Sequence, residues 1–583
     1  MVCQGEEPRT LFWLGTPDRA ARHIQEAIYD GPIDHRGYDY QPIILEKLPS
    51  LPDGDAIVDT VIVQEGDEIV DANNNPVELT EGVILRPTGC HSPECAIEFT
   101  GEPVEMDQME VTFTLLEGIR WSDGEPVTAD DSVYGFEMHS HPDTPAAKYT
   151  TLRTASYEAL DEQSTLWMGL PGYLDHNYAL NFFHPLPRHL WEEELGYTAG
   201  DLVTAEESTR RPLGWGPFTI KEWIAGDHIT VVRNPLYFRS DEDLPKLDAV
   251  IYRFVADPNV ALTQLLAGEC DIVTQDGGLD SQTDLLIELD EHGVLHAEFA
   301  TDTLWEHLDF GINTARSYNR PDFFGDVRMR RAVAYCLDRV GAVEQLLYGR
   351  SQVLDSYLPP GHPLFDAELV RRYRHDPDAG MTLLEELGWT DEDGDGIREA
   401  HGVEGIRENT PLEFTWQSTN QDLHVRYMEI FQEDLAECGI QVFPQSLPSL
   451  EFFAQGPEGP LYGRAFDVAS FAWSSSVTPP PCDLYLTSEI PDEDNDWSSS
   501  NFSGFSNETY DVICTAALQA LPGMESYVQR HLEAQRIFSE QLPALPLFLR
   551  LKTAATRINV LGFEMDATET SEMWNIEAFD LER

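Results

Sequence analysis

Two stretches of the chain predict the same strand–helix–strand order. Within 250–273, an apolar strand precedes a helix that starts at Asp257 and stops at Gly268, and a second strand follows. Within 412–442, side chains alternate as in a strand, then follow helical spacing up to Gly439, then alternate again. Repeated β-α-β units are typical of α/β folds, so we expect that fold class.

The length of the chain predicts more than one lobe. The chain has 583 residues, whereas single hydrophobic cores stop growing at roughly 250 to 300 residues.

The formal charge of the chain, -67, arises from 104 acidic residues against 37 Lys and Arg. Such a charge argues strongly against nucleic acid and anionic membrane surfaces as partners.

The segment 111–137 reads as a strand, a turn and a capped helix. Val111 and Phe113 lie on one face of an extended segment, and the Asp123-Gly124 pair favours a turn. Thr128, with Asp131 three residues later, forms a variant of the capping box. Farther toward the N-terminus, 56–100 holds short alternating runs between Gly, Asn and Pro turns, which predicts a meander of hairpins.

Three strings carry a resemblance to a known family. They are VTFTLLEGIRWSDGEPVTADDSVYGFE at 111–137, GWGPFTIKEWIAGDHITVVRNPLYF at 214–238, and LDFGIN at 308–313. In this order they resemble the extracellular solute-binding proteins of family 5, the oligopeptide- and dipeptide-binding family of ABC importers. The resemblance implies a two-lobed, periplasmic-binding-protein-like α/β fold (type II, large cluster C type) with an extra β-rich subdomain in lobe one.

The resemblance also implies two hinge crossings, near Asn313 and Leu545, which allow closure over a ligand by small dihedral changes. The expected divisions are 1–310 for lobe one, with the β-rich subdomain at about 56–212, then 311–545 for lobe two and 546–583 for the C-terminal return to lobe one.

The expected ligand contacts in lobe two centre on Trp473. In peptide-binding relatives a Trp at this place is followed three residues later by an Asp that pairs with the peptide's α-ammonium. Here Ser474 follows Trp473, and Ser476 stands where the aspartate is expected. A serine does not offset a buried ammonium as a carboxylate does. Because a Trp face beside hydroxyls also suits a sugar, oligosaccharide stays open as an alternative to peptide.

Further candidate contacts follow from the resemblance. Asn501 matches a family segment near the cleft, and Trp305 precedes the first hinge. In lobe one, the loop Leu14, Gly15 and Thr16 would face the ligand, between a strand expected at 10–14 and a helix expected at 19–29. For each of these residues, ordinary packing or a turn is the alternative interpretation, and for Trp473 the alternative is a place in the core.

The predicted function is an extracytoplasmic solute-binding receptor, in the periplasm or at the cell surface, that delivers its ligand to an ABC permease. We expect a monomer, no catalytic residues and no cofactor apart from a structural calcium ion. A nickel or other metal complex is a further ligand alternative, and a cell-surface hydrolase is the alternative from another class. The chain lacks the Gly-x-Ser-x-Gly, His-Glu-x-x-His and Gly-x-Gly-x-x-Gly strings.

A calcium site is the one metal site that the residues suggest. Asp391, Asp393 and Asp395 alternate before Gly396, as in the first half of an EF-hand loop. Position twelve of that loop is Gly402 instead of a bidentate Glu. The alternative is a turn rich in Asp and Gly.

The eight cysteines suggest disulfides in an oxidising compartment. Cys90 and Cys95 flank a short loop that a disulfide would close, and Cys482 with Cys514 is the second pairing. Cys336 lies in an apolar helical pattern and is expected to be a buried thiol.

The N-terminal cysteine suggests a membrane tether. Cys3 comes directly after Met-Val and before a polar stretch, so we expect it to carry a lipid in the native form. No run of about 18 apolar residues occurs, so no segment is expected to span a membrane.

Overall fold

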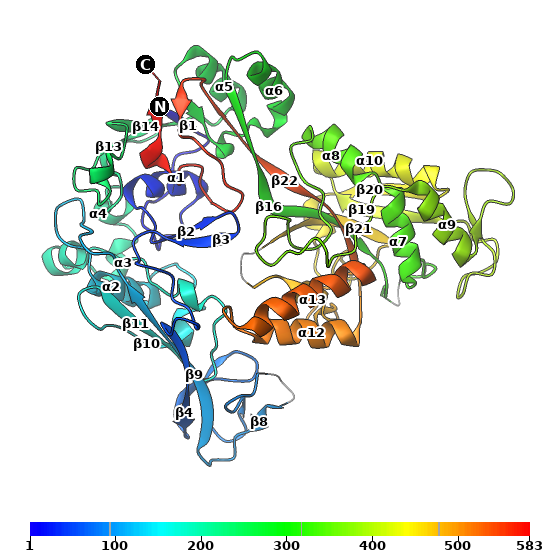
Figure 1. Ribbon diagram of the computed structural model, residues 1–583, viewed down its shortest axis with the longest axis horizontal. Helices are drawn as coiled ribbons and strands as arrows, with labels where there is room; N and C mark the ends of the chain where they lie inside the picture. Colours follow the sequence, from blue (N-terminus) through cyan, green and yellow to red (C-terminus); the bar gives the residue numbers. More distant parts are fainter. Residues whose placement is uncertain (92–94, 316–317, 476–478, 583) are drawn as a thin grey trace. The chain divides into compact units, whose positions relative to one another are not determined.

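The computed structural model describes residues 1–91, 95–315, 318–475 and 479–582, and the chain divides into two compact units (Figure 1). Unit 1 comprises Met1–Ala300, Leu521–Met524 and Lys552–Arg583, and unit 2 comprises Thr301–Ala520 and Glu525–Leu551. The boundaries at 300 and 551 fall inside two long strands, β16 (His296–Phe310) and β22 (Ala544–Thr556). The expected divisions at 310 and 545 lie in the same two strands.

The main sheet of unit 1 has the strand order β12-β13-β14-β1-β15-β22. Its strands are β12 (Phe218–Ile224), β13 (His228–Arg233), β14 (Ala249–Phe254), β1 (Val2–Gln4) and β15 (Ile272–Val273). The predicted strand–helix–strand unit is present as β14, α5 (Pro258–Ala267) and β15. The strand β1 lies between β14 and β15 and is parallel to both.

The strand expected at 10–14 is absent, and the first strand of the chain is β1 instead. Both segments are short apolar runs, and only β1 finds partner strands on both sides. The helix α1 (Arg19–Ile28) begins after Asp18, whose side chain accepts a hydrogen bond from the Ala21 backbone N–H.

The β-rich part of unit 1 is a four-stranded antiparallel sheet of order β10-β11-β9-β4. Its strands are β4 (Ala56–Val63), β9 (Val104–Thr114), β10 (Thr154–Ala159) and β11 (Ser164–Gly169). The helix α2 (Ala129–Ser140) begins with the predicted capping box of Thr128 and Asp131. Trp121 is buried, and its Nε1 donates to Asp131 Oδ2 at 3.3 Å, which ties the turn to the helix start.

In unit 2 the sheet order is β22-β16-β21-β19-β20. The strand β21 (Val468–Ser474) is antiparallel to β16 and parallel to β19 (Glu413–Thr419), which is parallel to β20 (Gln441–Leu447). The helix α10 (Asp422–Glu437) connects β19 to β20, which is the second predicted β-α-β unit. Trp416 and Phe414 of β19 and Phe431 of α10 belong to the core of this unit.

The remaining elements are short strands and the helices that cover the sheets. In unit 1 they are β2 (Ile33–Arg36), β3 (Asp39–Pro42), β5 (Glu68–Val70), β6 (Pro76–Glu78), β7 (Ile84–Leu85), β8 (Ile97–Glu98), α3 (Ala199–Leu202), α4 (Glu206–Thr209), α6 (Thr283–Glu291), β23 (Val560–Leu561) and β24 (Asp580–Leu581). In unit 2 they are α7 (Val327–Cys336), α8 (Arg339–Leu347), α9 (Pro377–Leu387), β17 (Trp389–Thr390), β18 (Glu399–Ala400), α11 (Ser449–Phe452), α12 (Glu508–Gln519) and α13 (Glu525–Gln541).

All eight cysteines form disulfides, which pair Cys3 with Cys270, Cys90 with Cys95, Cys336 with Cys438, and Cys482 with Cys514. The two pairings that the sequence favoured, Cys90 with Cys95 and Cys482 with Cys514, are both present. Complete pairing is typical of proteins that fold in an oxidising compartment.

The structure corrects the expectation for Cys3. Its side chain is fully buried in β1, between two neighbouring strands, and its sulfur is bonded to Cys270. A sulfur atom in a disulfide cannot also carry a thioether-linked lipid, so in this structure Cys3 is a cross-link between β1 and the residues just before β15 and is not a free attachment site.

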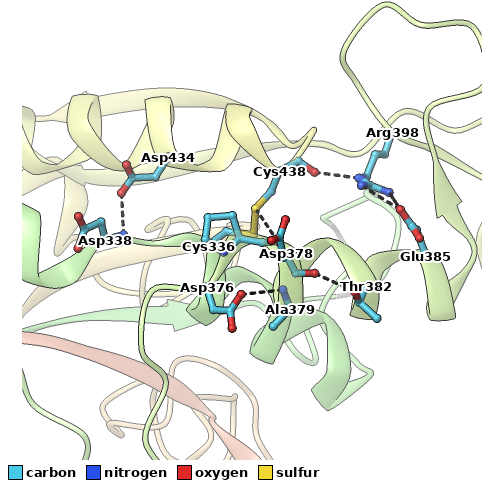
Figure 2. The surroundings of a disulfide bond; sticks show 11 residues. Cys336, Asp338, Asp376, Asp378, Ala379, Thr382, Glu385, Arg398, Asp434 and Cys438 are labelled. Carbon is cyan, nitrogen blue, oxygen red and sulfur yellow. Dashed lines mark hydrogen bonds and ion pairs between the residues drawn. A yellow bond between two sulfur atoms is a disulfide. The ribbon is translucent and has the colours of Figure 1, made fainter.

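The structure also corrects the expectation for Cys336. It is buried, as its apolar pattern predicted, but it is bonded to Cys438 and is not a free thiol (Figure 2). The bond joins the last residue of α7 to the residue that follows α10. Beside it, the Asp338 backbone N–H donates to Asp434 Oδ2 at 2.8 Å, and Arg398 Nε donates to the Cys438 carbonyl at 2.9 Å (Figure 2).

Among the described residues, no helix combines the length and the apolar character that crossing a membrane requires.

Candidate ligand-binding site

Trp473 lies near the end of β21 and is held by other aromatic rings of unit 2. Its ring is parallel to that of Phe502 within 4°, with centroids 6.0 Å apart, and Phe471 meets it edge-on at 5.3 Å. The side chain of Trp473 is half-buried. Packing therefore fixes the orientation of the indole while part of it stays accessible.

The hydroxyl groups of Ser474, in β21, and of Thr303, in β16, lie close together. Ser474 is exposed, and its Oγ is 3.3 Å from Oγ1 of Thr303, which belongs to β16. The next residue, Ser475, is buried, and its Oγ donates to the Tyr357 carbonyl at 3.0 Å. Ser476 lies outside the described residues. An accessible Trp face beside two hydroxyls can pack against an apolar surface of a solute and orient its polar groups.

Two other predicted contacts in unit 2 are fully buried. Trp305 is fully buried in the core of the unit. Asn501 is also fully buried; its Nδ2 donates to the carbonyls of Leu486 and Phe505, both at 2.8 Å. Its Oδ1 accepts from Ser503 Oγ at 2.9 Å and from the Phe505 N–H at 3.2 Å. Because an amide offers two donors and two acceptors, Asn501 is fully used in stabilising its own loop.

In unit 1, the loop 14–16 exposes one of its three predicted contacts. Leu14 is buried in a small cluster that includes Phe12 and Trp191. The Gly15 N–H donates to the Phe12 carbonyl at 2.9 Å, so the loop is a tight turn. Thr16 is exposed and has φ of 54°, and its hydroxyl donates to the Gly15 carbonyl at 2.7 Å. Thr16 is therefore the side chain of this loop that a ligand can reach.

Trp13 was missed in the sequence, although it directly precedes this loop. It is half-buried, its ring stacks on that of His184 at 3.9 Å within 7°, and the Arg22 guanidinium lies 4.5 Å from its centroid. Burial, assisted by the charge of Arg22, holds the pKa of His184 well below its ordinary value, so this ring is neutral. The sequence offered one signal for Trp13, which is that this aromatic residue directly precedes the predicted loop.

A charged network that the sequence did not reveal joins the two long strands of unit 2. Glu306 of β16 is fully buried, and its Oε1 accepts from Nε of Arg550 of β22 at 2.7 Å. His424 Nε2 lies 3.2 Å from the same oxygen. Burial by itself raises the pKa of Glu306, but hydrogen bonds and charges from His424 and Arg550 outweigh it, so the pKa lies below its ordinary value.

The predicted calcium loop forms a group of three exposed carboxylates. One oxygen from each of Asp391, Asp393 and Asp395 lies within 4.8 Å of the others. The same side chains accept backbone hydrogen bonds within the turn, such as that from the Gly394 N–H to Asp391 Oδ1 at 2.7 Å. The loop thus combines the carboxylate grouping and the Asp–Gly turn that the sequence predicted.

Comparison with known proteins finds relatives that are named as peptide-binding proteins. The chain is 26% identical over 480 residues to the oligopeptide-binding protein AppA of Bacillus subtilis. The alignment covers 79% of this chain and 78% of that protein. It is 23% identical over 487 residues to di/tripeptide-binding protein 2 of Pseudomonas aeruginosa, which covers 79% and 82%.

Solved structures show the same fold. The structure of Bacillus subtilis AppA in complex with a nonapeptide aligns with a TM-score of 0.55 at 20% identity, covering 100% of this chain and 98% of that one. The unliganded open form of MppA, a periplasmic murein tripeptide binding protein, aligns with a TM-score of 0.68 at 15% identity, covering 100% and 96%. The two-lobed α/β fold of the periplasmic binding proteins is thereby established for this chain.

The sequence profile of one family matches residues 100–492, well over half of the chain. This family consists of substrate-binding transport proteins that act outside the cytoplasm. The chain belongs to the bacterial extracellular solute-binding proteins, family 5.

Proposed function

We propose that this protein is the receptor of an ABC importer. It captures a peptide or a similar small polar solute in an interlobe cleft and delivers it to a membrane permease. Membership of family 5 and the names of the relatives, which bind oligopeptides and di- or tripeptides, support this proposal. The complete pairing of the cysteines supports a place outside the cytoplasm.

The observation that carries the proposal is the half-buried Trp473 beside the hydroxyls of Ser474 and Thr303. These three side chains offer an apolar face and hydrogen bonds but no charge. A peptide held here binds through its backbone and side chains, and its α-ammonium needs a carboxylate from elsewhere or a blocking group. Oligosaccharide is the second candidate, because the same uncharged surface suits a sugar ring.

The test starts with native mass spectrometry of freshly purified protein, which reports any ligand that the protein retains. Thermal-shift measurements with matched panels of peptides and oligosaccharides follow, because a ligand that binds only the folded state raises the melting temperature. Stabilisation by peptides supports the proposal, and stabilisation by sugars alone replaces it with the second candidate. Turnover of any panel member would overturn the receptor function.

We further propose that the loop 391–396 holds a structural calcium ion, since carboxylate oxygens are the preferred ligands of Ca²⁺. The grouping of Asp391, Asp393 and Asp395 supports this. The melting temperature of wild type and of Asp393→Asn is measured in calcium and in a chelator. If calcium raises it in neither protein, the loop is a turn that binds no calcium.

A further inference from the structure

Unit 2 contains a cavity of about 480 Å³ that shares no residue with the Trp473 surface. It lies between the start of α8, the segment 353–367 and the segment 372–375. Its lining combines arginines and aspartates with apolar side chains. The volume falls within the range of roughly 300 to 1,000 Å³ that is usual for small-molecule sites.

Arg339 holds the walls of the cavity together. It is almost fully buried, and its Nη1 donates to the carbonyls of Leu354 and Pro546, both at 2.6 Å. Its Nη2 donates to the Tyr373 carbonyl at 2.7 Å. Because most of its donors are spent on backbone carbonyls, Arg339 serves to preform the cavity rather than to bind a ligand.

The aspartates of the cavity are engaged by the protein itself. Asp355 lies between two arginines, with Oδ1 at 3.4 Å from Nη2 of Arg339 and Oδ2 at 3.7 Å from Nε of Arg372. Asp338 Oδ1 accepts from the Gly341 N–H at 2.9 Å, which caps α8. Asp366 Oδ1 accepts from the Glu368 N–H at 2.8 Å.

Of the three arginines in the lining, Arg374 is the one that the protein does not engage. Arg374 is exposed, and among the described residues its side chain has no hydrogen bond or ion pair. His375 Nδ1 is 3.8 Å from Asp338 Oδ2, which is too far for a hydrogen bond. The three arginines of the lining, Arg339, Arg372 and Arg374, are matched in number by Asp338, Asp355 and Asp366, so Arg374 is the charged group that is left available to a ligand.

The rest of the lining is apolar. Leu337, Val340, Val353, Pro360 and Phe365 contribute hydrocarbon surface, and Val340 is 49% exposed. A simple inorganic ion would leave this surface in contact with water, whereas an organic anion would cover it.

We propose that this cavity binds a small organic anion, with its acidic group at Arg374 and its apolar body against Val340 and Phe365. The planar guanidinium of an arginine pairs with a carboxylate or sulfonate through two hydrogen bonds. This is a second ligand site, independent of the solute that the Trp473 surface takes.

The proposal is tested with 1-anilinonaphthalene-8-sulfonate, an aromatic sulfonate whose fluorescence rises on binding. The full-length protein is titrated as wild type, as Arg374→Glu, and as Ala367→Trp, which adds an indole to the lining of the cavity. The matched control is Arg407→Glu, which makes the same charge change at an exposed arginine outside the lining. We expect affinity to fall at least tenfold in the two cavity variants and to change less than twofold in the control. Circular dichroism verifies folding, and Arg374→Gln repeats the test with a smaller perturbation.

Competition then separates the two parts of the site. Hexanoate should displace the probe at a concentration at least tenfold lower than inorganic phosphate does, because only hexanoate carries an apolar body. Unchanged probe affinity in the folded Arg374→Gln and Ala367→Trp variants overturns the proposal. Equal displacement by phosphate and hexanoate also overturns it, since the apolar wall would then contribute nothing.

Discussion

The Nε atom of Arg550 lies 2.7 Å from Oε1 of the fully buried Glu306, and this pair joins β22 to β16. Both strands cross between the two units of the chain. A buried charge is tolerated where a partner and further hydrogen bonds compensate it, and here Tyr427 and His424 add to the compensation at 3.4 and 3.2 Å. The crossing strands are thus joined by a specific polar contact as well as by backbone pairing.

Replacing Glu306 with Gln should lower the free energy of unfolding by about 3 kcal/mol, because it leaves the Arg550 charge without its partner. Urea unfolding followed by fluorescence measures the change. Glu433→Gln, an exposed position on α10, is the control and should stay within about 0.5 kcal/mol of wild type. Equal stability of the two variants would show that the pair contributes nothing.

The same pair gives a pH dependence of known sign. The pKa of Glu306 lies below its ordinary 4.5 in the folded protein, so its contribution is present above pH 4.5 and is lost as the pH falls through the lowered pKa. Between pH 5 and pH 3, wild type should therefore lose more stability than Glu306→Gln does. Parallel losses in the two proteins would contradict this assignment.

How far the sequence predicted the fold depended on how local each signal was. The ends of α5 are fixed by Asp257, which accepts N–H hydrogen bonds from the first turn, and by Gly268 with φ of 77°, so the sequence alone located them. By contrast, β1 became a strand because β14 and β15, far along the chain, flank it. Short apolar runs do not reveal such partners.

The candidate site shows the same limit. Trp305 and Trp473 face each other in the register of β16 and β21, yet one is fully buried and the other half-buried. Which tryptophan stays accessible depends on the helices and loops that cover the core of unit 2, and these are distant in sequence. Asn501 likewise resembled a ligand contact until its loop supplied partners for every polar atom of its amide.

A second pH effect is expected in unit 1. Burial, with charges from neighbouring carboxylates, raises the pKa values of Asp30, Asp34 and Glu569 to about 7. Because the folded state holds these protons more tightly than the unfolded state, their contribution to stability is full below about pH 4 and is lost as the pH rises toward 7. The melting temperature should therefore be higher at pH 5.5 than at pH 8.

The residue-level check is Asp34→Asn, which removes one of these titrations and should reduce the difference in melting temperature between the two pH values. Glu65→Gln, at an exposed position, is the control and should leave the difference unchanged. A difference as large in Asp34→Asn as in wild type would rule out this carboxyl as a source of the effect.

The disulfide between Cys336 and Cys438 should be a major source of stability. It links residues 102 positions apart, and a cross-link of that length is expected to contribute about 4.7 kcal/mol by restricting the unfolded chain. The double variant Cys336→Ser, Cys438→Ser should lose that order of stability in urea unfolding. Cys90 and Cys95 are only 5 positions apart, so the matching double serine variant should lose about 2 kcal/mol. The opposite ranking would contradict this account.

Ligand binding should depend on Trp473. Truncation to Ala removes an indole that Phe502 and Phe471 hold in place, and loss of such an aromatic contact should weaken binding at least tenfold, or by about 1.4 kcal/mol or more. Ser474→Ala removes one hydroxyl and should weaken binding by roughly threefold to tenfold, as loss of a single hydrogen bond does. Isothermal titration with the ligand found by mass spectrometry measures both changes. Leu450→Ala, at a side chain that is 93% exposed, is the control. If Trp473→Ala binds as tightly as this control, the indole is a packing element and the ligand contacts lie elsewhere.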